Sequence, residues 1–157
     1  MPSPSTLIKL PEARALQLRA IADVNGCTVT EAVELLINRE IKAGRLADAL
    51  PGFEIKVANK HVWFVVGEIG LPPLVPAHAR TVAAYFLNAA DSGDTARGIG
   101  LGQDEFKLIV SRKGRGIIVR AVDVAHEREA KETMTPGMAR DLARQLVKAA
   151  DSVQGRA

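Results

Sequence analysis

An internal repeat limits the folds that are open to the second half of this sequence. Residues 76–92 (PAHARTVAAYFLNAADS) recur sixty positions later as residues 136–152 (PGMARDLARQLVKAADS). Both copies begin with proline, which suits the first turn of a helix, and both continue with apolar residues at helical spacing. These apolar residues are Ala79, Val82, Ala83, Phe86, Leu87 and Ala90 in the first copy, and Ala139, Leu142, Ala143, Leu146, Val147 and Ala150 in the second. The repeat therefore predicts two helices that pack equivalent stripes against similar surfaces.

The residues before each predicted helix have the pattern of strands. Residues 53–57 and 62–66 are separated by a turn at Asn59 and Lys60, and residues 105–110 and 117–122 by a turn at residues 112–116. The simplest architecture is ββα followed by ββα, with a four-stranded, largely antiparallel sheet and both helices on one face. Trp63 and Val65 would then face away from the helices, where a partner chain or a ligand could cover them. The glycines of residues 98–102 are interpreted as a flexible linker, because a strand follows them and not the helix that a phosphate-binding loop needs.

The first 49 residues follow a different pattern. Residues 5–10 alternate as a strand does, and Pro11 ends that strand while suiting the first turn of a helix. Asn25 and Gly26 end the helix, because both tolerate the left-handed conformation found after helices. Thr28, with Glu31 three residues later, is typical of a capping box that opens a second helix. That helix is expected to end at Ala43-Gly44-Arg45, and a domain joint is expected near Pro51-Gly52.

The motif elements in this region are Leu10-Pro11-Glu12, then Leu18, Ile21-Ala22 and Gly26, then Thr28-Val29-Thr30-Glu31 with Val33. In this order and at this spacing, residues 5–43 resemble the ribbon-helix-helix (Arc/MetJ/CopG-like) superfamily of DNA-binding proteins. The resemblance implies a β-α-α head in residues 1–49. With the duplicated ββα domain in residues 50–157, the whole chain is expected to be an α+β protein.

The resemblance also implies a function. One strand and two short helices cannot bury enough apolar surface alone, so two chains are expected to form a homodimer. In the family the paired strands enter the major groove, and the amides that open the second helix hold a phosphate. Carried over position by position, the DNA contacts are Ser5, Leu7 and Lys9 for base edges and Thr28, Val29 and Thr30 for a phosphate. The sequence is therefore interpreted as that of a homodimeric, sequence-specific transcriptional regulator of the repressor type.

The charge of the head favours a different interpretation. Residues 1–49 carry six basic and six acidic residues, whereas neutralisation of phosphates supplies much of the affinity for DNA. In this alternative the same fold serves only as a dimerisation, assembly or protein-interaction module. A classical helix-turn-helix is a further alternative, because Ala22, Gly26 and Val33 also sit near the spacing of that motif. The alternating residues before Pro11 favour the ribbon.

The excess of positive charge lies in residues 50–157, which hold fifteen basic and twelve acidic residues. The densest basic cluster is the predicted turn with Arg112, Lys113 and Arg115. It is interpreted either as a solvated hairpin tip or as a second nucleic-acid contact. The repeated domain is expected to bind a small effector, a protein partner or another dimer, the last of which would give a higher oligomer. Arg80 and Arg140 occupy equivalent positions of the repeat and predict equivalent surface salt bridges.

Several classes of function are disfavoured. No window is long and apolar enough to span a bilayer and the start lacks the order of a signal peptide, so we expect a cytoplasmic protein without membrane contact. The single Cys27 cannot form an internal disulfide, which fits that compartment. The three histidines are far apart in the sequence and lack the spacing of a zinc helix, so no metal or other cofactor is expected. No nucleophile with its base and no pair of catalytic carboxylates can be identified, so an enzyme is not expected.

Overall fold

A computed structural model of the chain describes residues 6–92 and 96–155. Its internal contacts divide the chain into two compact units, with the boundary between Asp48 and Ala49.

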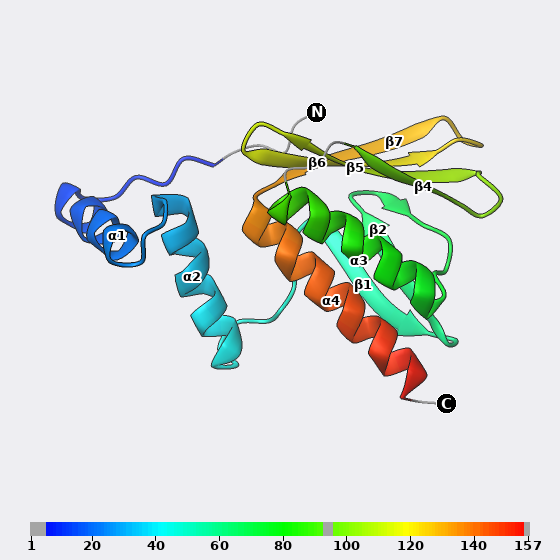
Figure 1. The fold of residues 1–157 in the computed structure, drawn as a ribbon, viewed down its shortest axis with the longest axis horizontal. Helices are drawn as coiled ribbons and strands as arrows, with labels where there is room; N and C mark the ends of the chain where they lie inside the picture. Colours follow the sequence, from blue (N-terminus) through cyan, green and yellow to red (C-terminus); the bar gives the residue numbers. More distant parts are fainter. Residues whose placement is uncertain (1–5, 93–95, 156–157) are drawn as a thin grey trace. The chain divides into compact units, whose positions relative to one another are not determined.

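The N-terminal unit consists of two helices, α1 (Glu12–Val24) and α2 (Val29–Lys42), in blue and cyan in Figure 1. Both helices end as predicted, at glycines with a left-handed backbone, Gly26 at φ +60° and Gly44 at φ +72°. After α1 the Gly26 amide donates to the Asp23 carbonyl at 3.2 Å and the Cys27 amide to the Ala22 carbonyl at 3.0 Å, which satisfies carbonyls that the helix leaves unpaired. The predicted capping box is also confirmed, because the Thr28 hydroxyl accepts from the Glu31 amide.

The predicted strand in residues 5–10 is wrong. Residues 6–10 belong to neither a helix nor a strand, so the unit begins helix-helix and is not the β-α-α fold expected from the resemblance. A strand requires a neighbour that pairs with its amides and carbonyls, and among the described residues of this chain nothing pairs with residues 6–10. Alternation in the sequence describes two faces, but it does not supply the second strand.

The C-terminal unit contains two antiparallel sheets and two helices. The first sheet has the order β1-β2-β3, formed by β1 (Phe53–Ala58), β2 (His61–Val66) and β3 (Ile69–Gly70). The second has the order β4-β5-β6-β7, formed by β4 (Arg97–Leu101), β5 (Phe106–Lys113), β6 (Gly116–Asp123) and β7 (Arg128–Met134). Helix α3 (Pro76–Asp91) follows the first sheet, and α4 (Pro136–Gln154) follows the second. Both helices have proline in the first turn, as the repeat predicts.

The prediction of one four-stranded sheet is therefore wrong, although both predicted hairpins exist. The hairpins belong to different sheets, and β7 and β4 extend the second one. Residues 98–102 are not a linker, because most of them form the edge strand β4. The Asp104 carboxylate occupies the space that a Cβ atom on Gly100 would fill. With glycine at two of its five positions, β4 has few of the β-branched residues by which strands are recognised.

The two repeated helices pack against each other in antiparallel orientation (Figure 1). Arg80, near the start of α3, lies 2.6 Å from Asp151 near the end of α4, and Arg140, near the start of α4, lies 2.8 Å from Asp91 at the end of α3. The predicted equivalence of the two arginines is thus confirmed as a reciprocal pair of salt bridges. This arrangement is what an approximate two-fold relation between the two repeats produces.

The core of this unit lies between the helix pair and the inner faces of the sheets. Helix α4 packs on β1 and β2, and α3 packs on β5. Phe64 is fully buried, with its ring centroid 6.3 Å from that of Phe53 and 6.3 Å from that of Phe86, so it joins the first sheet to α3. The apolar stripes predicted from the repeat are largely buried here, Leu87 being the exposed exception.

Candidate functional site

The N-terminal unit leaves an unusual amount of apolar surface uncovered. Of the sixteen large apolar side chains that are exposed in the described residues, twelve belong to residues 6–48. They are Leu7, Ile8, Leu10, Leu16, Ile21, Val24, Val29, Val33, Leu35, Leu36, Ile37 and Leu46. Among the described residues of this unit, the buried ones are two alanines, Ala22 and Ala32. A surface with this density of apolar side chains marks an interaction site.

The geometry of α2 explains why this surface is uncovered. At 100° per residue, its apolar positions form one stripe that runs from Ala32 through Leu36, Val29 and Val33 to Ile37. Ala32, at one margin of the stripe, is fully buried, whereas the larger side chains in the middle of the stripe remain exposed. The contact between α1 and α2 thus uses only the margin, and the rest of the stripe faces outward.

The DNA-contact residues predicted on the ribbon lie before α1. Ser5 lies outside the described residues, while Leu7 and Lys9 lie in the segment that forms no strand. Both side chains point into solvent, with Leu7 83% exposed. These positions are accessible, but residues 6–10 do not form the strand that was expected to hold the two side chains.

The predicted phosphate contact lies at the start of α2. The first amides of any helix lack intrahelical acceptors, and the helix dipole favours an anion beside them. In this chain Glu31 already supplies such an anion, because its carboxylate accepts from the Thr28 amide at 2.7 Å. The amides of Val29 and Thr30 follow on exposed residues of the first turn. Of the three predicted contacts, Thr28 is therefore occupied by the capping box.

The basic turn between β5 and β6 divides into two parts. Arg112 donates from Nη1 to the carbonyls of Ala89 at 2.9 Å and Ala90 at 3.2 Å, near the end of α3, and from Nε to the Gly114 carbonyl at 2.9 Å. A cation at the end of a helix pairs with carbonyls that the helix cannot satisfy. Lys113 and Arg115 are exposed at the tip. Arg112 thus belongs to the fold, and only its two neighbours are accessible to a ligand.

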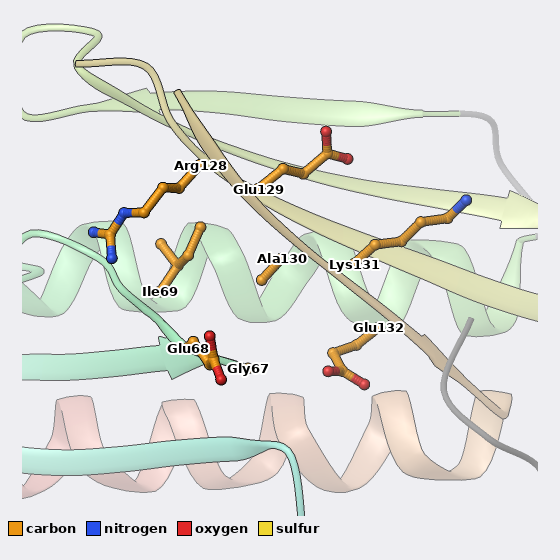
Figure 2. A pocket seen from close by; sticks show the side chains of 8 residues that line it. All are labelled: Gly67, Glu68, Ile69, Arg128, Glu129, Ala130, Lys131 and Glu132. Carbon is orange, nitrogen blue, oxygen red and sulfur yellow. The ribbon is translucent and has the colours of Figure 1, made fainter. Parts of the chain in front are cut away.

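A groove of about 670 Å³ lies between the segment after β2 and strand β7 (Figure 2). It is lined by Gly67, Glu68 and Ile69 on one side and by Arg128, Glu129, Ala130, Lys131 and Glu132 on the other. Two of its charged groups are paired within the chain, Arg128 with Asp123 at 2.8 Å and Glu129 with Arg120 at 2.5 Å. The groove is therefore a polar seam between the two sheets, in which a ligand would compete with internal ion pairs.

One buried charge was not foreseen from the sequence. The side chain of Asp123, at the end of β6, is 1% exposed. The guanidinium of Arg128 lowers the pKa of this carboxyl below its usual value, and the imidazole and backbone amide of His126 lower the same pKa further, against the effect of burial. The three residues are close in sequence, but only the turn between β6 and β7 makes them converge. The carboxylate thus orders that turn.

The outer face of the first sheet carries a second, shallower groove of about 280 Å³, lined by Glu54, Lys56, Ala58, Trp63 and Val65. Trp63 is 38% exposed, and its indole Nε1 donates to the Ala58 carbonyl at 3.3 Å. The prediction that Trp63 and Val65 face away from the helices is confirmed by their register positions opposite the exposed Lys56 and Glu54.

Comparison of the chain with models of known protein families, with curated proteins and with solved structures gives no match. No helix in the described ranges combines the length and apolar character needed to cross a membrane. Within residues 6–92 and 96–155, no three His, Cys, Asp or Glu side chains lie close enough together to hold a metal ion.

Proposed function

We propose that this chain is a homodimeric DNA-binding regulator, of the repressor type, that self-associates through its N-terminal unit. The observation that carries the proposal is the concentration of exposed apolar side chains on α1 and α2. A unit of this size that buries only two alanines is not expected to be stable in water alone. A second copy offers the same stripe, and a two-fold interface places identical patches against each other.

DNA is proposed as the ligand on two grounds. The first is the resemblance of the motif elements in residues 5–43 to a DNA-binding superfamily. The second is local chemistry, because the start of α2 presents the amides of Val29 and Thr30 beside the positive end of a helix dipole, and Lys9, in the segment before α1, is exposed. The two-stranded ribbon is not part of this proposal. The proposed function includes a cytoplasmic location, since a transcriptional regulator must reach DNA.

The second candidate is an assembly module that does not contact DNA. The balance of six basic and six acidic residues in residues 1–49 favours this candidate. So does the carboxylate of Glu31, which occupies the Thr28 amide where a phosphate would bind. Both candidates share the self-association of the N-terminal unit, so they differ only in whether DNA binds.

The self-association is tested by introducing a charge into the exposed stripe of α2. Val33→Asp is expected to lower the size of the assembly, because it buries a carboxylate in the proposed interface. Lys42→Asp is the control, because Lys42 lies nine residues away, on the opposite side of the helix by its 100° spacing. The measurement is molar mass by light scattering over a range of protein concentrations. An unchanged mass for Val33→Asp would contradict the proposed interface.

DNA binding is tested with a pool of random duplexes at low and moderate salt. The regulator predicts enrichment of a short site and a steep salt dependence of binding. Lys9→Ala should lower the affinity for that site, because it removes a cation from the DNA contact. Lys148→Ala, on the exposed side of α4, removes the same charge elsewhere and should leave binding unchanged. Binding that depends on Arg115 and not on Lys9 would move the contact to the basic turn. If the protein self-associates but binds no DNA, the regulator is excluded and the assembly module is the remaining candidate.

A further inference from the structure

Strand β1 is an edge of the first sheet. The order β1-β2-β3 leaves one side of β1 without a strand among the described residues. The strand is six residues long, contains no proline and pairs with β2 without a bulge. Natural proteins usually protect such an edge, since its unpaired amides and carbonyls accept another strand.

The backbone groups that β1 presents at this edge can be assigned from β2. Val62 exchanges two hydrogen bonds of 2.8 Å with Leu74, and the Phe64 carbonyl accepts from the Leu71 amide at 3.0 Å. These residues of β2 therefore direct their polar groups away from β1. Their register partners, Val57 and Ile55, occupy non-hydrogen-bonded pairs, and in an antiparallel pair such residues direct their own amides and carbonyls to the opposite side. The free edge thus offers the backbone groups of Ile55 and Val57.

The sequence of β1 is complementary to itself. Consider an antiparallel pair of two β1 strands with Ile55 opposite Ile55. Glu54 of the first copy then lies opposite Lys56 of the second, and Lys56 of the first copy lies opposite Glu54 of the second. Ile55 would form a hydrogen-bonded pair, so Glu54 and Lys56 would form the non-hydrogen-bonded pairs, in which side chains approach most closely. Both charged side chains are on the outer face, and both are more than half exposed.

We propose that the β1 strands of two copies pair in this register and join two three-stranded sheets into one. Two ion pairs then cross the interface on the outer face. Each cross-strand row would run from Trp63 through Lys56 to Glu54 and Val65 of the second copy, so the grooves of about 280 Å³ on the two outer faces become continuous. The proposed occupant of the edge is a second copy because the charges of β1 are complementary to those of the same strand in this register.

Strand β7, one of the two edges of the second sheet, is less suited to the same role. The segment after β2 faces it, and a Cβ atom on Gly67 would lie 3.2 Å from the Ala130 Cβ. Its Arg128 and Glu129 are paired with Asp123 and Arg120 of the same chain. In β1, by contrast, Glu54 and Lys56 pair only with each other along the strand in an exposed contact, which contributes little to stability.

The pairing of β1 does not depend on the proposed contact between N-terminal units. A chain with both surfaces has two different two-fold interfaces, and it therefore assembles beyond a dimer. Val33→Asp would remove one interface and leave the other. The failure of one proposal can accordingly be distinguished from the failure of the other.

The test reverses the charges of β1 in the full chain. In Lys56→Glu, the new carboxylate of each copy faces Glu54 of the other copy. In Glu54→Lys, the new ammonium group of each copy faces Lys56 of the other copy. Each variant alone is expected to weaken the β1 interface about tenfold or more, because two attractive pairs become repulsive. An equimolar mixture of the two variants should restore it, because every pair across the axis is then attractive again. The measurement is molar mass by sedimentation against protein concentration, with circular dichroism to verify folding.

Lys148→Glu is the matched control, because it makes the same change of charge on an exposed residue of α4. Its mass should equal that of the parent chain. The proposal is overturned if Lys56→Glu and Glu54→Lys keep the parent mass, which is also the result expected if the edge receives a peptide of another protein. It is equally overturned if both variants dissociate but their mixture does not reassociate.

Discussion

Arg112 shows how the partners of one side chain decide its role. It belongs to the densest basic cluster of the chain, which by composition alone suggests a nucleic-acid contact. Its guanidinium instead donates to the carbonyls of Ala89, Ala90 and Gly114. Hydrogen bonds from a charged donor to helix carbonyls contribute more than those of neutral groups. We therefore assign Arg112 to the joint between α3 and the second sheet.

Arg112→Ala is expected to lower the free energy of unfolding by about 2 kcal/mol, since it leaves carbonyls near the end of α3 unpaired. The comparison is with Arg115→Ala at the exposed tip of the same turn, which should change the stability by less than about 0.5 kcal/mol. Urea denaturation of both variants measures the difference. Equal stability of the two variants would show that the three hydrogen bonds of Arg112 do not support the fold.

At the scale of elements, the helix pair α3 and α4 depends on small side chains. Ala83 and Ala143 are equivalent positions of the repeat, and each is 1% exposed. Alanine fits the limited space at these buried positions, whereas a larger side chain would overpack the site. The reciprocal salt bridges of Arg80 and Arg140 lie on the exposed margin of the pair and are worth little by comparison.

Ala83→Leu and Ala143→Leu are each expected to destabilise the chain by about 1–3 kcal/mol, because a well-packed core accepts extra methyl groups only with strain. The near-symmetry of the repeats predicts similar losses for both. Ala84→Leu, on the exposed side of α3, is the control and should stay within about 0.5 kcal/mol of the parent chain. Thermal and urea unfolding provide the values. A tolerated leucine at Ala83 would mean that the helix pair is loosely packed.

At the scale of the whole molecule, the two units differ in how completely they bury their apolar residues. The C-terminal unit has a continuous core formed by both sheets and both helices. The N-terminal unit has two buried alanines and twelve exposed large apolar side chains. Residues 43–48, between α2 and the C-terminal unit, are exposed and lie outside any helix or strand. The chain thus combines a unit with a continuous buried core and a unit whose large apolar side chains are mostly exposed.

Trypsin is expected to cut first in the exposed irregular segments, after Lys9 and after Arg45, because such segments are cleaved before folded elements. The fragment from Leu46 onward should then persist, since its core is intact without the two N-terminal helices. Mass spectrometry over a time course identifies the cut. Arg45→Gln should delay the cleavage without changing the final C-terminal core. An early cut within residues 53–154 would contradict the view that this unit is complete.

The features that could be predicted from the sequence depend on residues a few positions apart. Thr28 with Glu31 marks the start of α2, and the glycines after α1 and α2 mark their ends, because capping joins neighbouring groups. The two repeated helices and the two central hairpins follow from periodicity in the same way. The strand predicted for residues 5–10 is wrong, because alternation reports the two faces of a strand and not the presence of its neighbour.

Only the tertiary structure decides how the hairpins are distributed between sheets and which charges become internal. The strands β4 and β7 are formed by glycine-rich and polar residues, so they exist because a neighbouring strand pairs with them. Arg112 meets carbonyls more than twenty positions earlier in the chain, and no spacing in the sequence predicts such a contact. Short-range order is encoded by neighbouring residues, whereas the partners of an edge strand, a buried carboxylate or a cation are chosen by the packing of distant segments.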